Sequence, residues 1–202
     1  MADQLWKKAT EIKSLEAAWH LTRSELRSDF FLDFYYQQAF ANFLAPQITE
    51  LHRVLRAGTY SPRSLRPVPV PKGPLSTRPG STIPLRDRVI LWSIVRTIAA
   101  SVYATLHTSV YSYTLKENPK QGELFREGDV LSLPFLKKKD ISAELDPFEA
   151  WYDLWPDFEE RTKEVIGIGY KYLVVSDVAA YFENINLDIL FDQLMGHLKS
   201  EP

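Results

Sequence analysis

The sequence predicts a helix-rich α+β fold that contains a β-hairpin, and three observations point to it. Apolar residues recur at helical spacing through most of residues 1–58 and again through residues 88–106. Residues 60–84 carry seven prolines, which forbid a regular helix, but the alternation over residues 65–70 still favours one strand of a hairpin. Residues 170–175 are an apolar run rich in Val, Leu and Tyr, the composition of a buried strand.

Composition narrows the class of protein. The 202 residues leave room for one domain or two small lobes, and 45% hydrophobic with 25% charged residues is ordinary for a globular chain. No window approaches the roughly 18 apolar residues that a bilayer-spanning helix needs, and the first residues lack the apolar centre of a signal peptide. We therefore expect no membrane partner. The chain also has no cysteine, so we expect a cytoplasmic protein without disulfides.

Charge is distributed unevenly along the chain. From Arg53 to Arg88 there are eight basic residues and one acid, Asp87, whereas residues 140–164 hold nine acids and two basic residues. A basic segment of this kind is typical of a surface that binds an anionic polymer, although two solvated faces of opposite sign remain an alternative. The acidic segment is expected to form a helix that ends at Pro156, used either for protein contact or for surface packing.

The first region, residues 1–58, is expected to be helical. An aromatic block over residues 30–43 is interpreted as core packing, because aromatic clusters at helical spacing pack in cores more often than they stack on bases. Pro46 suits the first turn of a further helix, and Gly58 suits the end of that helix.

A motif near the C-terminus combines a strand, a carboxylate and a helix. Asp177 follows the apolar run, so its carboxylate would lie where a strand leaves the core. An aromatic pair, Tyr181 and Phe182, comes a few residues later. Asn184 or Asn186 can cap the next helix. Taken alone, an aspartate after a strand is more often a turn residue than a catalytic group. The next helix carries apolar residues at helical spacing: Leu187, Leu190, Phe191, Leu194 and Met195.

The stretch that begins at Asp177 and contains the aromatic pair resembles the first palm motif of reverse transcriptases (RNA-directed DNA polymerases). It is most similar to the bacterial group related to group II introns, retrons and phage-defence enzymes. The resemblance implies that Asp177 is catalytic and binds the Mg²⁺ ions, with the Val178 carbonyl aiding one of them. It also implies that the backbone at Ala180 and Tyr181 cradles phosphate oxygens. Phe182 would be the gate that excludes a ribose 2′-hydroxyl.

A second resemblance lies upstream, in the basic segment. Residues 70–73, 78–79 and 83–90, which read VPKG, RP and IPLRDRVI, are similar to the fingers of the same family. In those enzymes a lysine and an arginine of the hairpin contact the triphosphate of the incoming nucleotide. By position these are Lys72 and Arg78. A guanidinium can bind two phosphate oxygens at once, which suits that role.

For five further residues of the basic segment we expect either a contact with nucleic acid or a structural role. Arg63, Arg66 and Arg86 are expected to contact nucleic acid, because their positive charges lie in the same acid-poor stretch. In the family, the residues that match Asp87 and Arg88 are mainly structural and tie the fingers to the palm, so we do not expect them to be catalytic.

The resemblance implies the fingers and a partial palm of a right-hand polymerase fold. Residues 1–58 would be an N-terminal helical region. Residues 59–169 would be the fingers, with the basic hairpin, a long helix and the acidic insertion. Residues 170–202 would begin the palm with a strand, the first catalytic motif and a helix.

The sequence lacks part of the family's catalytic set. Reverse transcriptases take their other carboxylates from a Tyr-x-Asp-Asp turn beyond the first palm motif, and this chain contains no Asp-Asp pair. Glu183, Asp188 and Asp192 are candidates by charge only, and we interpret all three as solvated. We therefore expect that this chain does not polymerise alone.

Three interpretations follow. We favour the N-terminal portion of a reverse transcriptase, which would use an RNA or DNA primer–template, dNTP and Mg²⁺ once the remaining part of the polymerase supplies the missing carboxylates. The second is a catalytically inactive polymerase-like subunit that binds nucleic acid or a partner protein. The third is an unrelated helical interaction protein with a proline-rich arm. The template type, and a role in mobility or in antiviral defence, stay open.

Overall fold

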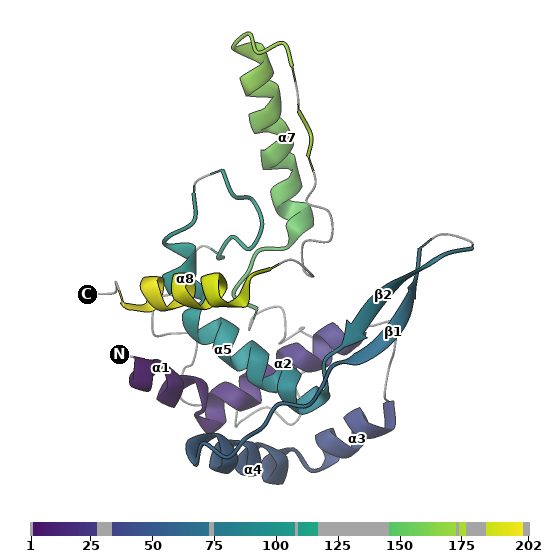
Figure 1. Cartoon of the computed structure of the whole chain (residues 1–202), viewed down its shortest axis with the longest axis vertical. Helices are drawn as coiled ribbons and strands as arrows, with labels where there is room; N and C mark the ends of the chain where they lie inside the picture. Colours follow the sequence, from purple (N-terminus) through teal and green to yellow (C-terminus); the bar gives the residue numbers. More distant parts are fainter. Residues whose placement is uncertain are drawn as a thin grey trace, which may run out of the picture. The chain divides into compact units, whose positions relative to one another are not determined.

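The computed structural model describes residues 2–27, 34–72, 75–107, 109–116, 146–172, 174–176 and 185–199. Within these ranges the chain forms seven helices and one two-stranded antiparallel sheet (Figure 1), which confirms a helix-rich α+β fold with a β-hairpin. The chain divides into two compact units. The N-terminal unit comprises Asp3–Thr97 and Gly122–Asp146, and the C-terminal unit comprises Met1–Ala2, Ile98–Gln121 and Pro147–Pro202.

The N-terminal unit begins with the helices that the periodicity of residues 1–58 predicts. The hairpin follows them, and a long helix then begins directly after it, with the division between the units falling after Thr97. In chain order the elements are α1 (Ala2–Ala9), α2 (Ile12–Arg27), α3 (Phe34–Asn42), α4 (Leu44–Arg56), β1 (Arg66–Pro71), β2 (Thr77–Thr82) and α5 (Leu85–Tyr103).

The core of this unit is built where α2, α3, α4 and the first turns of α5 meet. The rings of Trp19 and Phe40 pack with their centroids 4.7 Å apart. Burying such a set of apolar side chains removes their surface from water and supplies the main favourable free energy of folding. The buried cluster comprises Leu15, Ala18, Trp19, Leu26, Phe40, Ile48, Leu51, Leu55, Leu85, Val89 and Ile90.

Helix α4 has the start and the end that its sequence predicts. Pro46 lies in its first turn, where a missing N–H removes no helical hydrogen bond. Gly58 follows the helix with φ at +65°, a left-handed conformation that costs glycine little. The Thr59 amide donates to the Val54 carbonyl at 3.0 Å and closes the end of the helix.

The aromatic block is only partly in the core. Phe40 is 1% exposed, as core packing predicts, but Phe34, Tyr35 and Phe43 are more than half exposed, so the interpretation was wrong for these three. The reason is geometric. The aromatic residues point to several sides of α3, whereas a helix buries only the stripe that faces its neighbours.

Helix α7 (Trp151–Gly167) belongs to the C-terminal unit and runs through Pro156, so the prediction that the helix ends there was wrong. A proline near the first turns removes a single backbone hydrogen bond. Side-chain contacts continue along the helix across and beyond the proline: Trp155 donates a hydrogen bond of 2.8 Å to Glu159, and Arg161 and Glu164 form an ion pair of 2.8 Å.

Helix α8 (Leu187–Lys199) starts as predicted. The Asn186 side-chain oxygen accepts hydrogen bonds from the amides of Asp188 and Ile189 at 3.0 and 3.1 Å, and so forms the N-cap. The apolar side chains of its first turn are nevertheless not buried. Leu187, for example, is 73% exposed.

The predicted strand over residues 170–175 is the main correction to the fold. The described residues 170–172 and 174–176 belong to no strand, and Tyr172 and Val174 are 90% and 86% exposed. A strand must pair its backbone N–H and C=O groups with a neighbour. Within the described residues, the only sheet is β1–β2, whose two strands pair with each other. The apolar run therefore has the composition of a strand, but among the described residues no other segment pairs with it.

Across the described residues, no helix combines the length and the apolar character that crossing a bilayer requires.

Candidate nucleic-acid interface

The first turns of α5 contact several other segments of the N-terminal unit. Leu85, Val89 and Ile90 are buried in the core. Most of the run at residues 83–90 therefore forms the start of a helix, in which Leu85, Val89 and Ile90 face the core and the charged residues lie between them. The expected helix over residues 88–106 is α5, displaced by three residues towards the N-terminus because Pro84 precedes its first turn.

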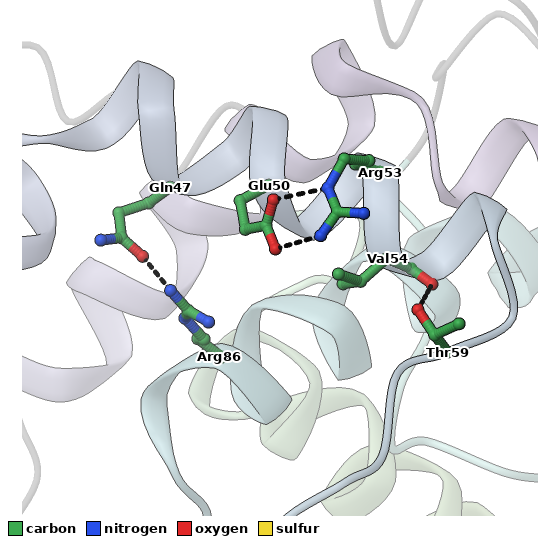
Figure 2. A network of polar contacts seen from close by, with 6 residues as sticks. All are labelled: Gln47, Glu50, Arg53, Val54, Thr59 and Arg86. Carbon is green, nitrogen blue, oxygen red and sulfur yellow. Dashed lines mark hydrogen bonds and ion pairs between the residues drawn. The ribbon is translucent and has the colours of Figure 1, made fainter.

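The charged residues of this run contact three different parts of the unit. Arg86 donates to the Gln47 side chain of α4, as Figure 2 shows. Arg88 is 8% exposed and lies 3.9 Å from Glu25 of α2. Trp92, one turn further on, donates to the same Glu25 carboxylate at 2.8 Å. These contacts hold α5 against α4 and α2.

Asp87 contacts the chain that leads into the hairpin. Its carboxylate accepts a hydrogen bond from the Tyr60 hydroxyl at 2.7 Å and another from the Arg63 backbone amide at 3.3 Å. Burial raises the pKa of Tyr60, and the hydrogen bond to Asp87 raises it further, so the hydroxyl remains a donor well above neutral pH. We call residues 61–84, which this contact holds at their base, the arm.

The two faces of the arm differ in chemistry. Strands β1 and β2 pair antiparallel, with Arg66 opposite Thr82 and Val70 opposite Arg78. Side chains that are directly opposite share a face, and alternate residues along a strand take opposite faces. One face therefore presents Arg66, Val68, Val70, Arg78, Gly80 and Thr82. The other presents Pro67, Pro69, Pro71, Thr77, Pro79 and Ser81, all of them exposed.

The prolines explain how this sequence forms a strand at all. Pro67, Pro69 and Pro71 lack an N–H, so their positions must be the ones that do not donate to β2. The residues between them supply the donors that face β2. Within β1, no N–H is left to point outwards, and this protects that edge of the hairpin from pairing with another chain. Prolines at every second position are thus compatible with a two-stranded arm.

Lys72 extends the charged face to the turn. Its amide donates to the Ser76 carbonyl at 2.8 Å, which continues the register of the two strands by one further pair. Lys72 therefore occupies a position on the same face as Arg66 and Arg78. All three are exposed, and no acidic residue lies anywhere in residues 61–84. We call Arg66, Lys72 and Arg78 the cationic row.

Gly80 keeps the centre of this face closely packed. A Cβ atom at position 80 would lie 2.5 Å from a methyl group of Val70 and 3.3 Å from the Val68 carbonyl. Glycine at position 80 therefore leaves room for the Val70 side chain on this face of the hairpin. Val70 is itself directly opposite Arg78 in the neighbouring strand. Val68 and Val70 thus form a small apolar surface between Arg66 and Lys72.

The other predicted contacts divide between exposed and half-buried residues. Arg63 is exposed at the base of the arm. Arg86 is only half exposed, and its guanidinium is engaged by Gln47, so less of its charge is available to a phosphate. The anchoring residues Tyr60, Gln47 and Glu25 carry no signal in the local sequence pattern, because each contact joins residues far apart in the chain.

The predicted catalytic motif lies outside the described residues. This holds for Asp177, Val178, Ala180, Tyr181 and Phe182. Among the residues that the structure does describe, no group of three His, Cys, Asp or Glu side chains is placed to hold a metal ion. The Mg²⁺ site, the phosphate cradle and the sugar gate remain predictions from the sequence.

Comparisons with models of protein families, with curated proteins and with solved structures give no match for this chain.

Proposed function

We propose that this chain provides the nucleotide- and template-binding fingers of an RNA-directed DNA polymerase of the reverse transcriptase type, with Asp177 as its first palm carboxylate. The observation that carries the proposal is the cationic row. Arg66, Lys72 and Arg78 share one face of the arm, and the arm contains no acid. Such a row suits a ligand whose negative charges are spaced along a chain, as in a triphosphate or a nucleic-acid backbone.

Within this proposal the residues of the arm divide the work by position. Lys72 and Arg78, nearest the turn, hold the triphosphate of the incoming nucleotide, and the guanidinium of Arg78 can bind two of its oxygens. Arg66 and Arg63, nearer the base of the arm, contact the phosphates of the template. Arg86 contributes through the field of its charge more than through direct contact, because Gln47 already accepts a hydrogen bond from it.

Catalysis of the reverse transcriptase type requires the carboxylates of a Tyr-x-Asp-Asp turn, and this chain contains no such turn. When bound, Mg²⁺ would activate the primer hydroxyl and stabilise the leaving pyrophosphate, and it requires oxygen ligands in octahedral geometry. Asp177 and the Val178 carbonyl do not complete such a set, and the chain has no Asp-Asp pair. We therefore assign nucleotide and template binding to this chain and no catalytic step. Extension of a primer would need carboxylates from further polypeptide.

A second candidate function follows from the same missing pair. A polymerase-like subunit that has lost catalysis would keep the arm and bind nucleic acid for another purpose. The genomic DNA downstream distinguishes the two, because only the first candidate requires that it encode a Tyr-x-Asp-Asp segment, in the same frame or another.

Charge reversal on the arm tests binding directly. We would measure binding of a fluorescently labelled primer–template by anisotropy over a series of salt concentrations, using the double variant Lys72→Glu/Arg78→Glu. We expect affinity to fall by at least about tenfold, and the slope of log K against log salt to shrink by about two. The matched control is Lys8→Glu/Arg23→Glu, which makes the same change of net charge at exposed positions of α1 and α2.

The outcomes separate the interpretations. Loss of binding in the arm variant but not in the control supports either nucleic-acid-binding candidate. Equal loss in both variants would mean that net charge, and not the arm, governs binding. No binding by the unmodified protein at low salt would contradict the proposal and favour a helical interaction protein with a proline-rich arm.

A further inference from the structure

We infer that Asp87 is the positioning residue that sets the direction of the arm and so governs ligand binding without contacting the ligand. Its single carboxylate holds two points on the chain that enters the arm, the Tyr60 hydroxyl and the Arg63 amide. The chain that leaves the arm enters α5 at Leu85, two residues before Asp87. Both ends of the arm therefore converge on the first turn of one helix.

The local structure suits Asp87 to this role. It lies in the first turn of α5, where the positive end of the helix dipole stabilises a carboxylate. The ring of Tyr60 packs against the core cluster, so this donor is itself held in place. The Arg63 contact uses a backbone amide, which means that it fixes the path of the chain and leaves the Arg63 side chain exposed.

The arm needs such an anchor because it has little other support. Its strands contact each other much more extensively than they contact any helix, and Figure 1 shows the hairpin projecting from the helices of its own unit. A two-stranded hairpin is marginal by itself and cannot fix its own direction relative to a core. The contact at Asp87 supplies that direction.

Electrostatics alone predicts the opposite effect of removing this residue. Taking away a negative charge near a cationic row should strengthen the binding of an anion. In Asp87→Asn, however, only one of the two side-chain atoms that face Tyr60 and Arg63 is still an oxygen, and a neutral amide makes weaker hydrogen bonds than a carboxylate. A loosened arm is competent for binding only part of the time. We therefore expect primer–template affinity to fall by about tenfold. The salt slope should not change, because the cationic row is intact.

The direction of the arm can be measured without any ligand. The chain has no cysteine, so Leu75→Cys and Thr49→Cys provide two unique labelling sites. Leu75 is 100% exposed beside the turn of the arm, and Thr49 is exposed on α4. With spin labels at both sites, double electron–electron resonance gives the distribution of distances between the arm and the core. We expect a narrow distribution in the otherwise unmodified protein and a broad one when Asp87→Asn is added.

Two further variants complete the test. Tyr60→Phe keeps the ring in the core and removes only the hydroxyl, so it should broaden the distribution even if Asp87→Asn fails to fold. Asp3→Asn is the control, because it removes the same charge from an exposed ion pair with Lys7 in α1. It should leave the distribution narrow.

The results distinguish this inference from the proposed function on which its effect on binding rests. An unchanged, narrow distribution in folded Asp87→Asn and Tyr60→Phe would overturn the positioning role. A broad distribution with unchanged primer–template affinity would support the positioning role and contradict the arm as the binding element.

Discussion

The chain at residues 83–90, at the start of α5, differs in packing from residues 170–176, the apolar run that precedes Asp177. At residues 83–90 the side chains of Leu85, Val89 and Ile90 are buried, and Arg86, Asp87 and Arg88 each contact a different segment of the N-terminal unit. At residues 170–176 the described side chains are exposed, and no neighbouring strand pairs with them among the described residues. The first segment therefore lies against a packed core, whereas the described residues of the second make no such contacts.

The contrast has an energetic consequence. Burial makes the first region part of a cooperative core, whereas the second region and α8 gain little from packing in the described structure. Substitutions should therefore have large effects in the N-terminal unit and small effects in α8.

Truncation of one buried and one exposed leucine gives the largest difference. Leu51→Ala removes a fully buried side chain of α4 and should lower the free energy of unfolding by about 2–5 kcal/mol. Leu190→Ala shortens a residue of α8 that is 43% exposed and should change it by less than about 0.5 kcal/mol. Urea unfolding followed by tryptophan fluorescence measures both. Equal losses would show that α8 is packed as tightly as the core.

Glycine substitutions compare the arm with α8. Gly80→Ala forces a Cβ against Val70 and should destabilise the hairpin by about 1–3 kcal/mol. Gly196→Ala meets nothing within 4 Å and should stabilise α8 by about 0.5–1 kcal/mol through helix propensity. Hydrogen exchange at the Lys72 amide, which donates across the hairpin, and at the amides of α8 reports each effect. Slower exchange at Lys72 in Gly80→Ala would contradict the packing of the arm's valine face.

The N-cap of α8 tests how that helix is held when packing contributes little. Asn186→Ala removes the acceptor of two amide hydrogen bonds and should destabilise the helix by about 1 kcal/mol. Asn186→Asp keeps an acceptor and should retain most of the helix. Faster amide exchange at Asp188 and Ile189 in the alanine variant is the expected result. Equal exchange in all three proteins would mean that packing, and not capping, fixes the start of α8.

The Tyr60 hydroxyl predicts a loss of stability at high pH. Because burial and the hydrogen bond to Asp87 raise the pKa of Tyr60, the unfolded chain loses this proton before the folded chain does. The contribution of Tyr60 is therefore fully present below about pH 10, the ordinary pKa of tyrosine, and declines as pH rises above it. Tyr60→Phe should flatten this decline in thermal melts between neutral and alkaline pH. An unchanged slope would show that Tyr60 does not face Asp87 in solution.

Local patterns predicted the elements whose causes are local. The helices of residues 1–58, the hairpin, the glycine end of α4 and the Asn186 cap follow from periodicity and from turn chemistry, which act over a few residues. The prediction of a strand over residues 170–175 was wrong because strand formation depends on a pairing partner, which the composition of one segment does not reveal. The exposure of Tyr35 could not be read from the sequence for a similar reason, since it depends on which side of α3 meets the core.

The candidate site was predictable only in its charged residues. Lys72, Arg78 and Arg66 could be chosen from the sequence, but their common face depends on the pairing register. The contact between Tyr60 and Asp87 joins residues from two different elements, and no short pattern encodes it. The sequence therefore indicated which charges the arm carries, whereas the structure shows how these charges are arranged and what holds the arm.

The most direct test of the cationic row as a phosphate-binding surface is an NMR titration of the isotope-labelled protein with thymidine triphosphate. We expect the guanidinium resonance of Arg78 and the amide resonance of Lys72 to shift together and to saturate, while the exposed basic residues of α1 and α2 stay unchanged. Shifts confined to residues outside the arm, or none at a saturating concentration, would contradict the proposed binding surface.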